Sequence, residues 1–91
     1  SQEASAAQII GALGGAANIV SVDNCFTRLR VELKDDALVD EAALNATGAK
    51  GVIKKGHEVQ IIYGVQVGTL RHHVEDSLAA PFEQAAVRND I

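Results

Sequence analysis

A single cysteine and two arginines form the most reactive combination in this sequence. Cys25 follows Asp23 and Asn24, and Arg28 and Arg30 come soon after it. Asp and Asn are typical turn residues, and turns lie at the protein surface. A thiol exposed beside fixed positive charge has a lowered pKa and is more often the nucleophilic thiolate. The spacing therefore predicts a reactive cysteine at a turn.

The same segment carries groups suited to binding an anion. A guanidinium offers forked N–H donors that match phosphate oxygens, and backbone N–H groups at a turn add further donors. The Thr27 hydroxyl can donate to the same oxygens. A nucleophilic Cys25 surrounded by Thr27, Arg28 and Arg30 suggests a phosphoryl group held on sulfur.

Each of these residues also has a structural interpretation. A lone cysteine is most often a small buried hydrophobic residue. The arginines can be polar side chains of a solvated strand face, with Glu32 as a partner, and Thr27 is a good strand former. If a straight strand ran through Cys25, alternation would place the thiol opposite the arginines. The chemical interpretation therefore requires the turn to interrupt the strand before Thr27.

Hydrophobic periodicity predicts the elements that position this turn. Helices are predicted at 6–13, 40–47 and 67–80, and strands at 18–22, 26–33, 51–55 and 58–64. Gly14-Gly15 and Pro81 are the expected ends of the first and last helices. Asp40 is the expected N-cap of the middle helix, and Gly48 is its expected C′ residue.

The order of elements predicts the fold class. Each pair of strands is joined by a short turn, so the four-stranded sheet is expected to be mainly antiparallel. Three helices on one face give a two-layer α+β sandwich of order α-β-β-α-β-β-α. The other face is expected to be partly open, with Arg28 and Arg30 pointing toward it. We expect residues 1–5 to be a disordered tail, 6–80 the domain, and 81–91 a tail, a further helical turn or a linker.

Composition narrows the classes of function. The chain has 91 residues, of which 47% are hydrophobic and 22% charged, as expected for one globular domain. Its net charge of −4 and scattered basic residues argue against nucleic-acid binding. No apolar run approaches the roughly 20 residues that span a bilayer. One cysteine cannot form an internal disulfide. The adjacent His72 and His73 diverge on a helix and His57 is far away in the chain, so no metal site is predicted.

The residues around Cys25 resemble a known family. Segments 13–35, 39–53 and 58–64 closely resemble the enzyme IIB domain of the glucose family of bacterial sugar phosphotransferase systems. The similarity runs from about Ala6 to Leu78, and its specific centre is Cys25 followed by Thr27-Arg28-Leu29-Arg30. The flanking motifs, in the family's order, are Gly14-Gly15 with Asn18-Ile19, Gly48-Ala49 with Gly51-Val52, and Gln60-Ile61-Ile62-Tyr63-Gly64.

The resemblance implies a specific reaction. In that family the cysteine accepts a phosphoryl group from a phosphohistidine on a IIA protein or domain, and passes it to a sugar bound by the membrane IIC domain. Carried onto this sequence, Cys25 is the phosphate carrier, Arg28 and Arg30 stabilise the thiophosphate, and Thr27 helps to hold its oxygens. No metal or organic cofactor is required.

The resemblance also implies partners and a location. The expected partners are IIA and sugar-loaded IIC, and we expect the isolated domain to be monomeric. In the family, IIB is a cytoplasmic domain tethered to the cell membrane through IIC in a longer protein. Phe26, beside the cysteine, either belongs to the docking surface or caps the edge of the core.

Three other functions use some of the same residues. A cysteine-based phosphatase needs Cys-x5-Arg in a loop leading into a helix, whereas here four residues separate Cys25 from Arg30 in a predicted strand. A redox-sensing thiol fits a lowered pKa but leaves two arginines unexplained. A non-catalytic α+β interaction domain predicts no role for Cys25 and tolerance of Arg28→Lys.

Overall fold

The computed structural model describes residues 2–89 of the chain, and the side chains of residues 5–79. Helices and strands follow one another in the predicted order, with two short 3-10 helices in loops that the sequence did not assign. The elements are α1 (Gln2–Ala12), η1 (Ala16–Asn18), β1 (Ile19–Asn24), β2 (Arg28–Leu33), η2 (Asp36–Leu38), α2 (Glu41–Ala46), β3 (Gly51–Lys55), β4 (Glu58–Ile62) and α3 (Val67–Asn89).

The four strands form one antiparallel sheet in the order β1-β2-β4-β3. Its outer pairs, β1-β2 and β3-β4, are the two predicted hairpins. The central pair joins β2 to β4, which are distant in sequence, with Arg30 opposite Gln60 and Leu29 opposite Ile61. The predicted antiparallel sheet is confirmed, and β2 lies inside it with a neighbour on each side.

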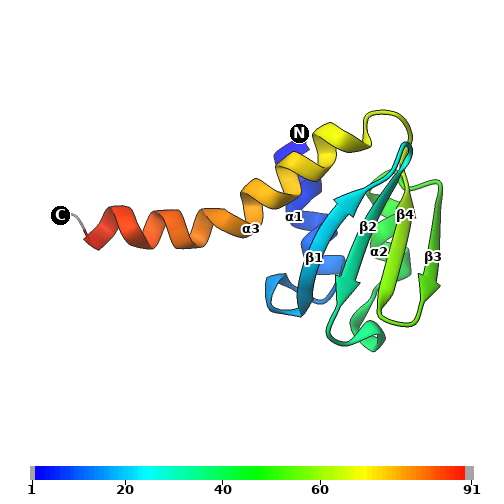
Figure 1. Cartoon of the computed structure of the whole chain (residues 1–91), viewed down its shortest axis with the longest axis horizontal. Helices are drawn as coiled ribbons and strands as arrows, with labels where there is room; N and C mark the ends of the chain where they lie inside the picture. Colours follow the sequence, from blue (N-terminus) through cyan, green and yellow to red (C-terminus); the bar gives the residue numbers. More distant parts are fainter. Residues whose placement is uncertain (1, 90–91) are drawn as a thin grey trace.

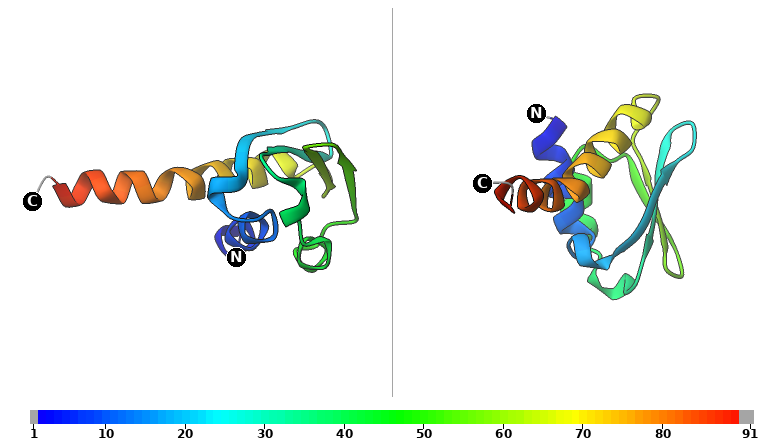
Figure 2. Two further views of the ribbon diagram at one scale, coloured as in Figure 1. Left: turned by 90° about the horizontal axis from the view of Figure 1, so that it is seen from below. Right: turned by 60° about the vertical axis from the view of Figure 1, so that its left-hand side comes forward.

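The helices cover one face of the sheet and leave the other face open (Figure 1). The right-hand view in Figure 2 shows the helices on one side of the curved sheet. Two layers therefore enclose the core between them, as the pattern predicted. Because β2 and β4 are central, side chains that point away from the helices lie on the middle of the open face.

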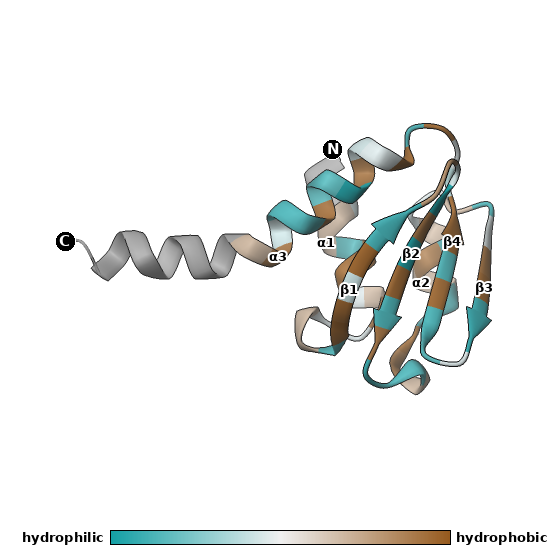
Figure 3. Cartoon of the chain, in the orientation of Figure 1, coloured by the Kyte–Doolittle hydropathy of each residue, from teal (hydrophilic) through white to brown (hydrophobic). Residues whose placement is uncertain are grey.

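Alternation along the strands separates the core from this open face. Figure 3 shows hydrophobic and hydrophilic residues alternating along β2 and β4. In β2, Leu29, Val31 and Leu33 are buried, while Arg30 and Glu32 are exposed. The remaining buried core residues are Ala6, Ile9, Ala12, Leu13, Leu44, Val59, Ile61, Tyr63, Val67, Leu70 and Val74. The predicted apolar faces of the strands and helices are thus confirmed.

The C-terminal end of α1 and both ends of α2 carry the residues that the sequence predicted there. Gly14 and Gly15 follow α1 with φ angles of 97° and 95°, a region that favours glycine. The Asp40 side chain accepts a hydrogen bond from the backbone N–H of Ala43 and is the N-cap of α2. Gly48, with φ 96°, follows the C-cap Thr47.

The outer ends of α1 and α3 differ from the prediction. Helix α1 begins at Gln2, inside the segment expected to be a disordered tail, because Gln, Glu and Ala favour helix. Helix α3 continues through Pro81 to Asn89, so the expectation that Pro81 ends it is corrected. A proline inside a helix removes one backbone donor and either kinks the helix or ends it, and Figure 1 shows α3 changing direction along its length.

Candidate functional site

The turn between β1 and β2 carries the cysteine. The backbone N–H of Cys25 donates to the carbonyl oxygen of Arg28 at 3.0 Å and closes a loop formed by Phe26 and Thr27. This turn interrupts the alternation of the chain, as the chemical interpretation required. Asn24 lies opposite the buried Leu29, so the next side chain, Cys25, emerges on the open face.

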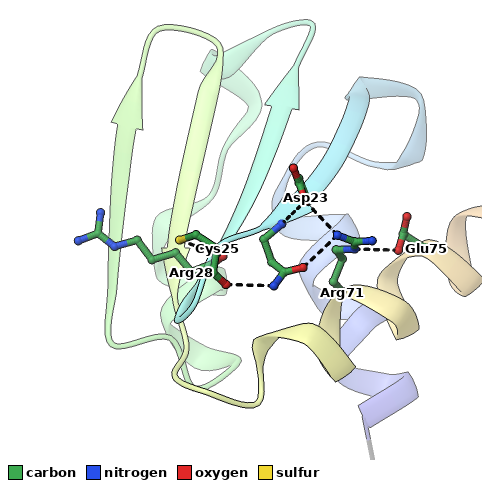
Figure 4. A network of polar contacts seen from close by, with 6 residues as sticks. Asp23, Cys25, Arg28, Arg71 and Glu75 are labelled. Atoms are coloured by element: carbon green, nitrogen blue, oxygen red, sulfur yellow. Dashed lines mark hydrogen bonds and ion pairs between the residues drawn. The ribbon is translucent and has the colours of Figure 1, made fainter.

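The thiol is exposed and shares its surroundings with both arginines. Cys25 is a free, exposed cysteine, so the alternative of a small buried hydrophobic residue is wrong. Figure 4 shows its sulfur near the Arg28 side chain, with Arg71 on the other side of the turn. Glu58 raises the pKa of the Arg30 guanidinium through a hydrogen bond and its charge, and Cys25 is close enough to add a smaller rise.

The backbone of the turn favours the thiolate. A backbone hydrogen bond from Arg28 is the main reason that the pKa of the Cys25 thiol is lowered from 9.0. Backbone hydrogen bonds from Thr27 and Cys25 itself and the charge of Arg28 lower this pKa further, while partial desolvation opposes them. The protonated thiol instead lies 3.8 Å from the Arg28 carbonyl oxygen, to which it can donate. The predicted nucleophilic form is therefore supported mostly by backbone N–H groups.

The two arginines are held by side chains from β4. An Arg28 terminal nitrogen donates to Gln60 Oε1 at 3.0 Å, and Arg30 Nε forms an ion pair with Glu58 Oε1 at 2.9 Å. The structural interpretation named Glu32 as the partner, and this is corrected to Glu58. Residues 32 and 58 are opposite each other in the register, and the carboxylate that reaches Arg30 comes from the neighbouring strand.

The far side of the turn rests on the loop between β4 and α3. The carbonyl oxygen of Thr27 accepts hydrogen bonds from the backbone N–H groups of Tyr63 and Gly64, both at 3.0 Å. Thr27 is half-buried, and its backbone contributes to the lowered pKa of the thiol. Residue 27 is thus fixed through its backbone, an anchor that the sequence did not predict.

A network of polar side chains links the turn to α3 (Figure 4). A terminal nitrogen of Arg71 donates to Asp23 Oδ1 at 2.9 Å and to Asn24 Oδ1 at 3.1 Å. Its Nε donates to Glu75 Oε1 at 3.0 Å, and Asn24 Nδ2 donates to the Cys25 carbonyl oxygen at 3.0 Å. Sequence reasoning assigned none of these contacts, although the i, i+4 spacing of Arg71 and Glu75 is a recognisable helical pair.

Two exposed apolar residues flank the cysteine. Phe26 forms the tip of the turn and is 80% exposed, so the alternative in which it caps the core is wrong. Val65 is 74% exposed and follows Gly64 in the loop that holds Thr27. Isolated exposed apolar residues are common, but two of them beside a reactive group suit a protein contact.

Cys25 is exposed at the end of the open face, where the turn joins β1 to β2. A hollow of about 450 Å³ on the open face borders Arg30 and is also lined by Asp23 and Glu58. Among residues 5–79, no group of three or more His, Cys, Asp or Glu side chains is placed to hold a metal ion. Within the described range, no helix has the length and apolar character needed to cross a membrane. An exposed thiol of lowered pKa beside two guanidinium groups can attack an anionic group that another molecule brings to it.

Comparison with known proteins points to one family. Residues 7–40 match the family model described as phosphotransferase system, EIIB. The chain is 44% identical over 73 residues to the N-acetylglucosamine-specific EIIB component of Streptomyces coelicolor, covering 80% of this chain and 95% of that protein. It is also 41% identical over 68 residues to the glucose-specific EIICBA component of Staphylococcus carnosus, covering 75% of this chain but 10% of that protein.

A solved structure agrees with the sequence matches. One domain of the IIabc component of the phosphotransferase system from Clostridium difficile superimposes with a TM-score of 0.74 at 30% identity. The match covers 82% of this chain and 80% of that one. The chain therefore spans 95% of one relative and 80% of this solved domain, but 10% of the glucose-specific EIICBA relative.

Proposed function

This chain belongs to the EIIB family of the sugar phosphotransferase system, and from that premise we propose that it is a phosphoryl carrier acting through Cys25. The thiol accepts a phosphoryl group from a phosphohistidine of a IIA protein or domain and transfers it to a sugar held by IIC. The observation that carries this proposal is the exposed thiol of lowered pKa, on the same face as Arg28 and Arg30. The activity is that of a protein-phosphocysteine–sugar phosphotransferase.

The first step forms a sulfur–phosphorus bond and breaks a nitrogen–phosphorus bond. The Cys25 thiolate attacks the phosphorus in line with the leaving imidazole, which departs as neutral histidine after gaining a proton. Because backbone N–H groups lower the pKa of the Cys25 thiol, a larger share of it is in the attacking thiolate form than for an unperturbed cysteine. The same N–H groups then donate to oxygens of the bound phosphoryl group.

The arginines neutralise the phosphoryl group in both steps. Within residues 5–79, Arg28 and Arg30 each make a single side-chain hydrogen bond, and a guanidinium has five N–H donors. Gln60 and Glu58 therefore orient the two side chains while most of their donors remain for phosphate oxygens. In the second step a sugar hydroxyl oxygen attacks phosphorus, loses its proton, and the thiolate leaves. Positioning and charge neutralisation suffice for this chemistry.

A carrier has to meet two partners in turn with the same group. The protruding turn fits this requirement better than a pocket, because each partner supplies its own cavity around the phosphorus. Phe26, next to Cys25, and Val65, in the loop that bonds Thr27, provide apolar contact area for both encounters. The larger relatives are named EIICB and EIICBA, names that join B to C, and in the second case also to A, in one chain. By the same reasoning, this domain works on the cytoplasmic side of a membrane-bound IIC.

The test is intact-mass analysis after incubation with a phosphoenolpyruvate-driven IIA donor system. We expect the chain to gain one phosphoryl group, and the Cys25→Ser variant to gain none. The adduct should be lost on addition of sugar-loaded membranes containing a matching IIC. The donor is first shown to phosphorylate its own IIB partner, so that an inactive donor cannot explain a negative result.

Other outcomes would identify the alternatives. Phosphorylation that persists in Cys25→Ser would place the phosphoryl group elsewhere and overturn the assignment of Cys25. Turnover of small phosphate esters would indicate a phosphatase, and rapid reaction with peroxide without phosphorylation would indicate a redox sensor. A chain that does none of these would be an interaction domain.

A further inference from the structure

We propose that Arg71 is a positioning residue that holds the Cys25 turn in its reactive geometry through Asn24. The inference rests on the proposed carrier function, because it concerns how the same thiol is presented. Arg71 does not lie on the open face with the arginines of β2. It acts from α3, on the other side of the turn (Figure 4).

The first argument is the continuity of the contacts. Glu75 fixes Arg71 Nε at 3.0 Å, and a terminal nitrogen of Arg71 reaches Asn24 Oδ1 at 3.1 Å. The other end of the Asn24 amide donates to the carbonyl oxygen of Cys25 at 3.0 Å. An amide that accepts at one end and donates at the other transmits the position of α3 to the peptide group of the reactive residue.

The second argument concerns the carboxylate beside the thiol. Asp23 lies two positions before Cys25, and a negative charge there opposes both the thiolate and an incoming phosphoryl group. Arg71 binds Asp23 Oδ1 at 2.9 Å, and the same oxygen accepts from the backbone N–H of Asn24 at 2.8 Å. These bonds pair the carboxylate, which stands opposite Arg30 in the register, with a positive charge that comes from α3.

The third argument is that stability does not account for this arrangement. The Asp23 side chain is 71% exposed and Arg71 is 31% exposed, and ion pairs in contact with solvent contribute little to folding. The turn is already closed by the Cys25–Arg28 bond and anchored through Thr27. Besides its pair with Glu75, Arg71 adds a bridge from α3 to residues 23 and 24 of the turn.

The experiment compares six forms of the chain: wild type, Arg71→Met, Arg71→Lys, Asn24→Ala, the double variant Asn24→Ala with Arg71→Met, and Lys34→Met. Lys34 is exposed and follows β2 at the end opposite Cys25, so Lys34→Met controls for the loss of one positive charge. Each form is assayed for its rate of phosphoryl acceptance and for the pH dependence of iodoacetamide reaction with Cys25. Circular dichroism melting records whether each form is folded. Arg28, Arg30 and Asp23 are the charged groups near the thiol that remain in all of them.

We expect Arg71→Met to accept phosphate about tenfold more slowly, because small displacements of a reacting atom have large effects on rate. The midpoint of the alkylation profile should rise, since Asp23 is then unpaired and the N–H groups of the turn are less well oriented. In Arg71→Lys the alkylation midpoint should lie between those of wild type and Arg71→Met. An ammonium can pair with Asp23 but cannot bridge three partners. Asn24→Ala should reproduce the slower rate, and combining it with Arg71→Met should add little.

The proposal is overturned if Arg71→Met is folded and matches Lys34→Met in both rate and alkylation midpoint. It is also overturned if the only change is a lower melting temperature. If Arg71→Met does not fold, Asn24→Ala decides, and an unchanged rate and midpoint there reject the proposal. Failure of wild type to accept phosphate would reject the carrier function, whereas the alkylation profiles test the role of Arg71 independently.

Discussion

The two ends of the β1–β2 hairpin use asparagine in opposite ways. Asn18, just before β1, is 6% exposed and donates from Nδ2 to the carbonyl oxygens of Leu13 and Asp35, at 2.8 and 2.9 Å. Its Oδ1 accepts from the backbone N–H of Asp35 at 2.9 Å. Asn24, at the other end of β1, bonds an exposed turn and the charged side chain of Arg71.

The difference shows how one fold separates stability from reactivity. At the Asn18 end, buried backbone groups are paired inside the protein, so no donor there is directed at a ligand. At the Cys25 end, the backbone N–H groups of the turn act on the thiol and the guanidinium groups face solvent. We therefore expect substitutions at the first end to change stability, and substitutions at the second end to change the rate of phosphoryl transfer.

The largest expected effect is at the reactive end. Arg28→Gln should slow phosphoryl acceptance by about 10²–10³-fold, because it removes one charged donor from the developing thiophosphate. Its melting temperature should change little, since the side chain is only half-buried and bonds a single partner. Stopped donor assays read by intact mass measure the rate.

Arg28→Lys is the matched variant for charge. A lysine keeps the positive charge but loses the forked geometry, so it should recover only part of the rate. Full activity in Arg28→Lys would agree with the interaction-domain alternative and would remove the assigned role of Arg28.

The next effect is on stability at the closed end. Asn18→Ala leaves two carbonyl oxygens and one N–H without their partner, and should lower the free energy of unfolding by about 2–4 kcal/mol. Urea unfolding followed by circular dichroism measures this change. Asn24→Ala is the matched control. We expect it to lower the free energy of unfolding much less than Asn18→Ala does, because the partners of the Asn24 side chain are accessible to water. Equal losses in the two variants would contradict the separation drawn between the ends.

A smaller effect is expected at the glycines that precede Asn18. A Cβ on Gly14 would lie 2.8 Å from both Asn18 Nδ2 and Leu38 Cβ, whereas one on Gly15 meets nothing within 4 Å. Both glycines have positive φ, so an alanine at either is strained by about 1–3 kcal/mol. Gly14→Ala should therefore be less stable than Gly15→Ala, as measured by thermal melting. Identical melting temperatures would show that the closed end adjusts to the added methyl group.

The smallest expected effect is the pH dependence of stability due to the thiol. The pKa of Cys25 is lowered in the folded chain from its ordinary 9.0, chiefly by the backbone hydrogen bond from Arg28. At a pH between the pKa of Cys25 in the folded chain and its pKa in the unfolded chain, mainly the folded state has lost the proton. The free energy of unfolding therefore rises with pH between these two pKa values, and this contribution is lost as pH falls through the folded pKa. Urea midpoints of wild type and Cys25→Ser, measured from about pH 7 to about pH 10, should diverge slightly. Parallel curves would indicate that the turn does not favour the thiolate.

Most of the fold followed from patterns within short stretches of sequence. The alternation of Leu29, Val31 and Leu33 with polar residues gave the buried face of β2, and Asp40 and Gly48 marked the ends of α2. Predictions at the chain ends were weaker, because residues 2–5 are good helix formers and a proline inside a helix is compatible with a bend.

The candidate site was predicted in its residue types but not in its contacts. Sequence indicated that Cys25, Thr27, Arg28 and Arg30 belong together, since all four lie within one turn and the strand after it. It offered Glu32 as a partner for the arginines, whereas the partners are Gln60 and Glu58. Glu32 could be proposed as a partner because it lies on the same strand face as the arginines. Which strand lies next to β2, and so which side chains reach the arginines, depends on the topology of the sheet.

The sequence by itself determined the elements, the α+β class and the chemistry available at Cys25. These depend on side-chain periodicity, turn residues and charge among near neighbours, which a single stretch of chain contains. Only the tertiary structure decided that the thiol emerges beside the arginines, that β4 orients both guanidinium groups, and that Arg71 reaches Asn24 from α3. Such contacts join residues far apart in the chain, and they form only when burial of the apolar faces has fixed how the sheet and helices pack.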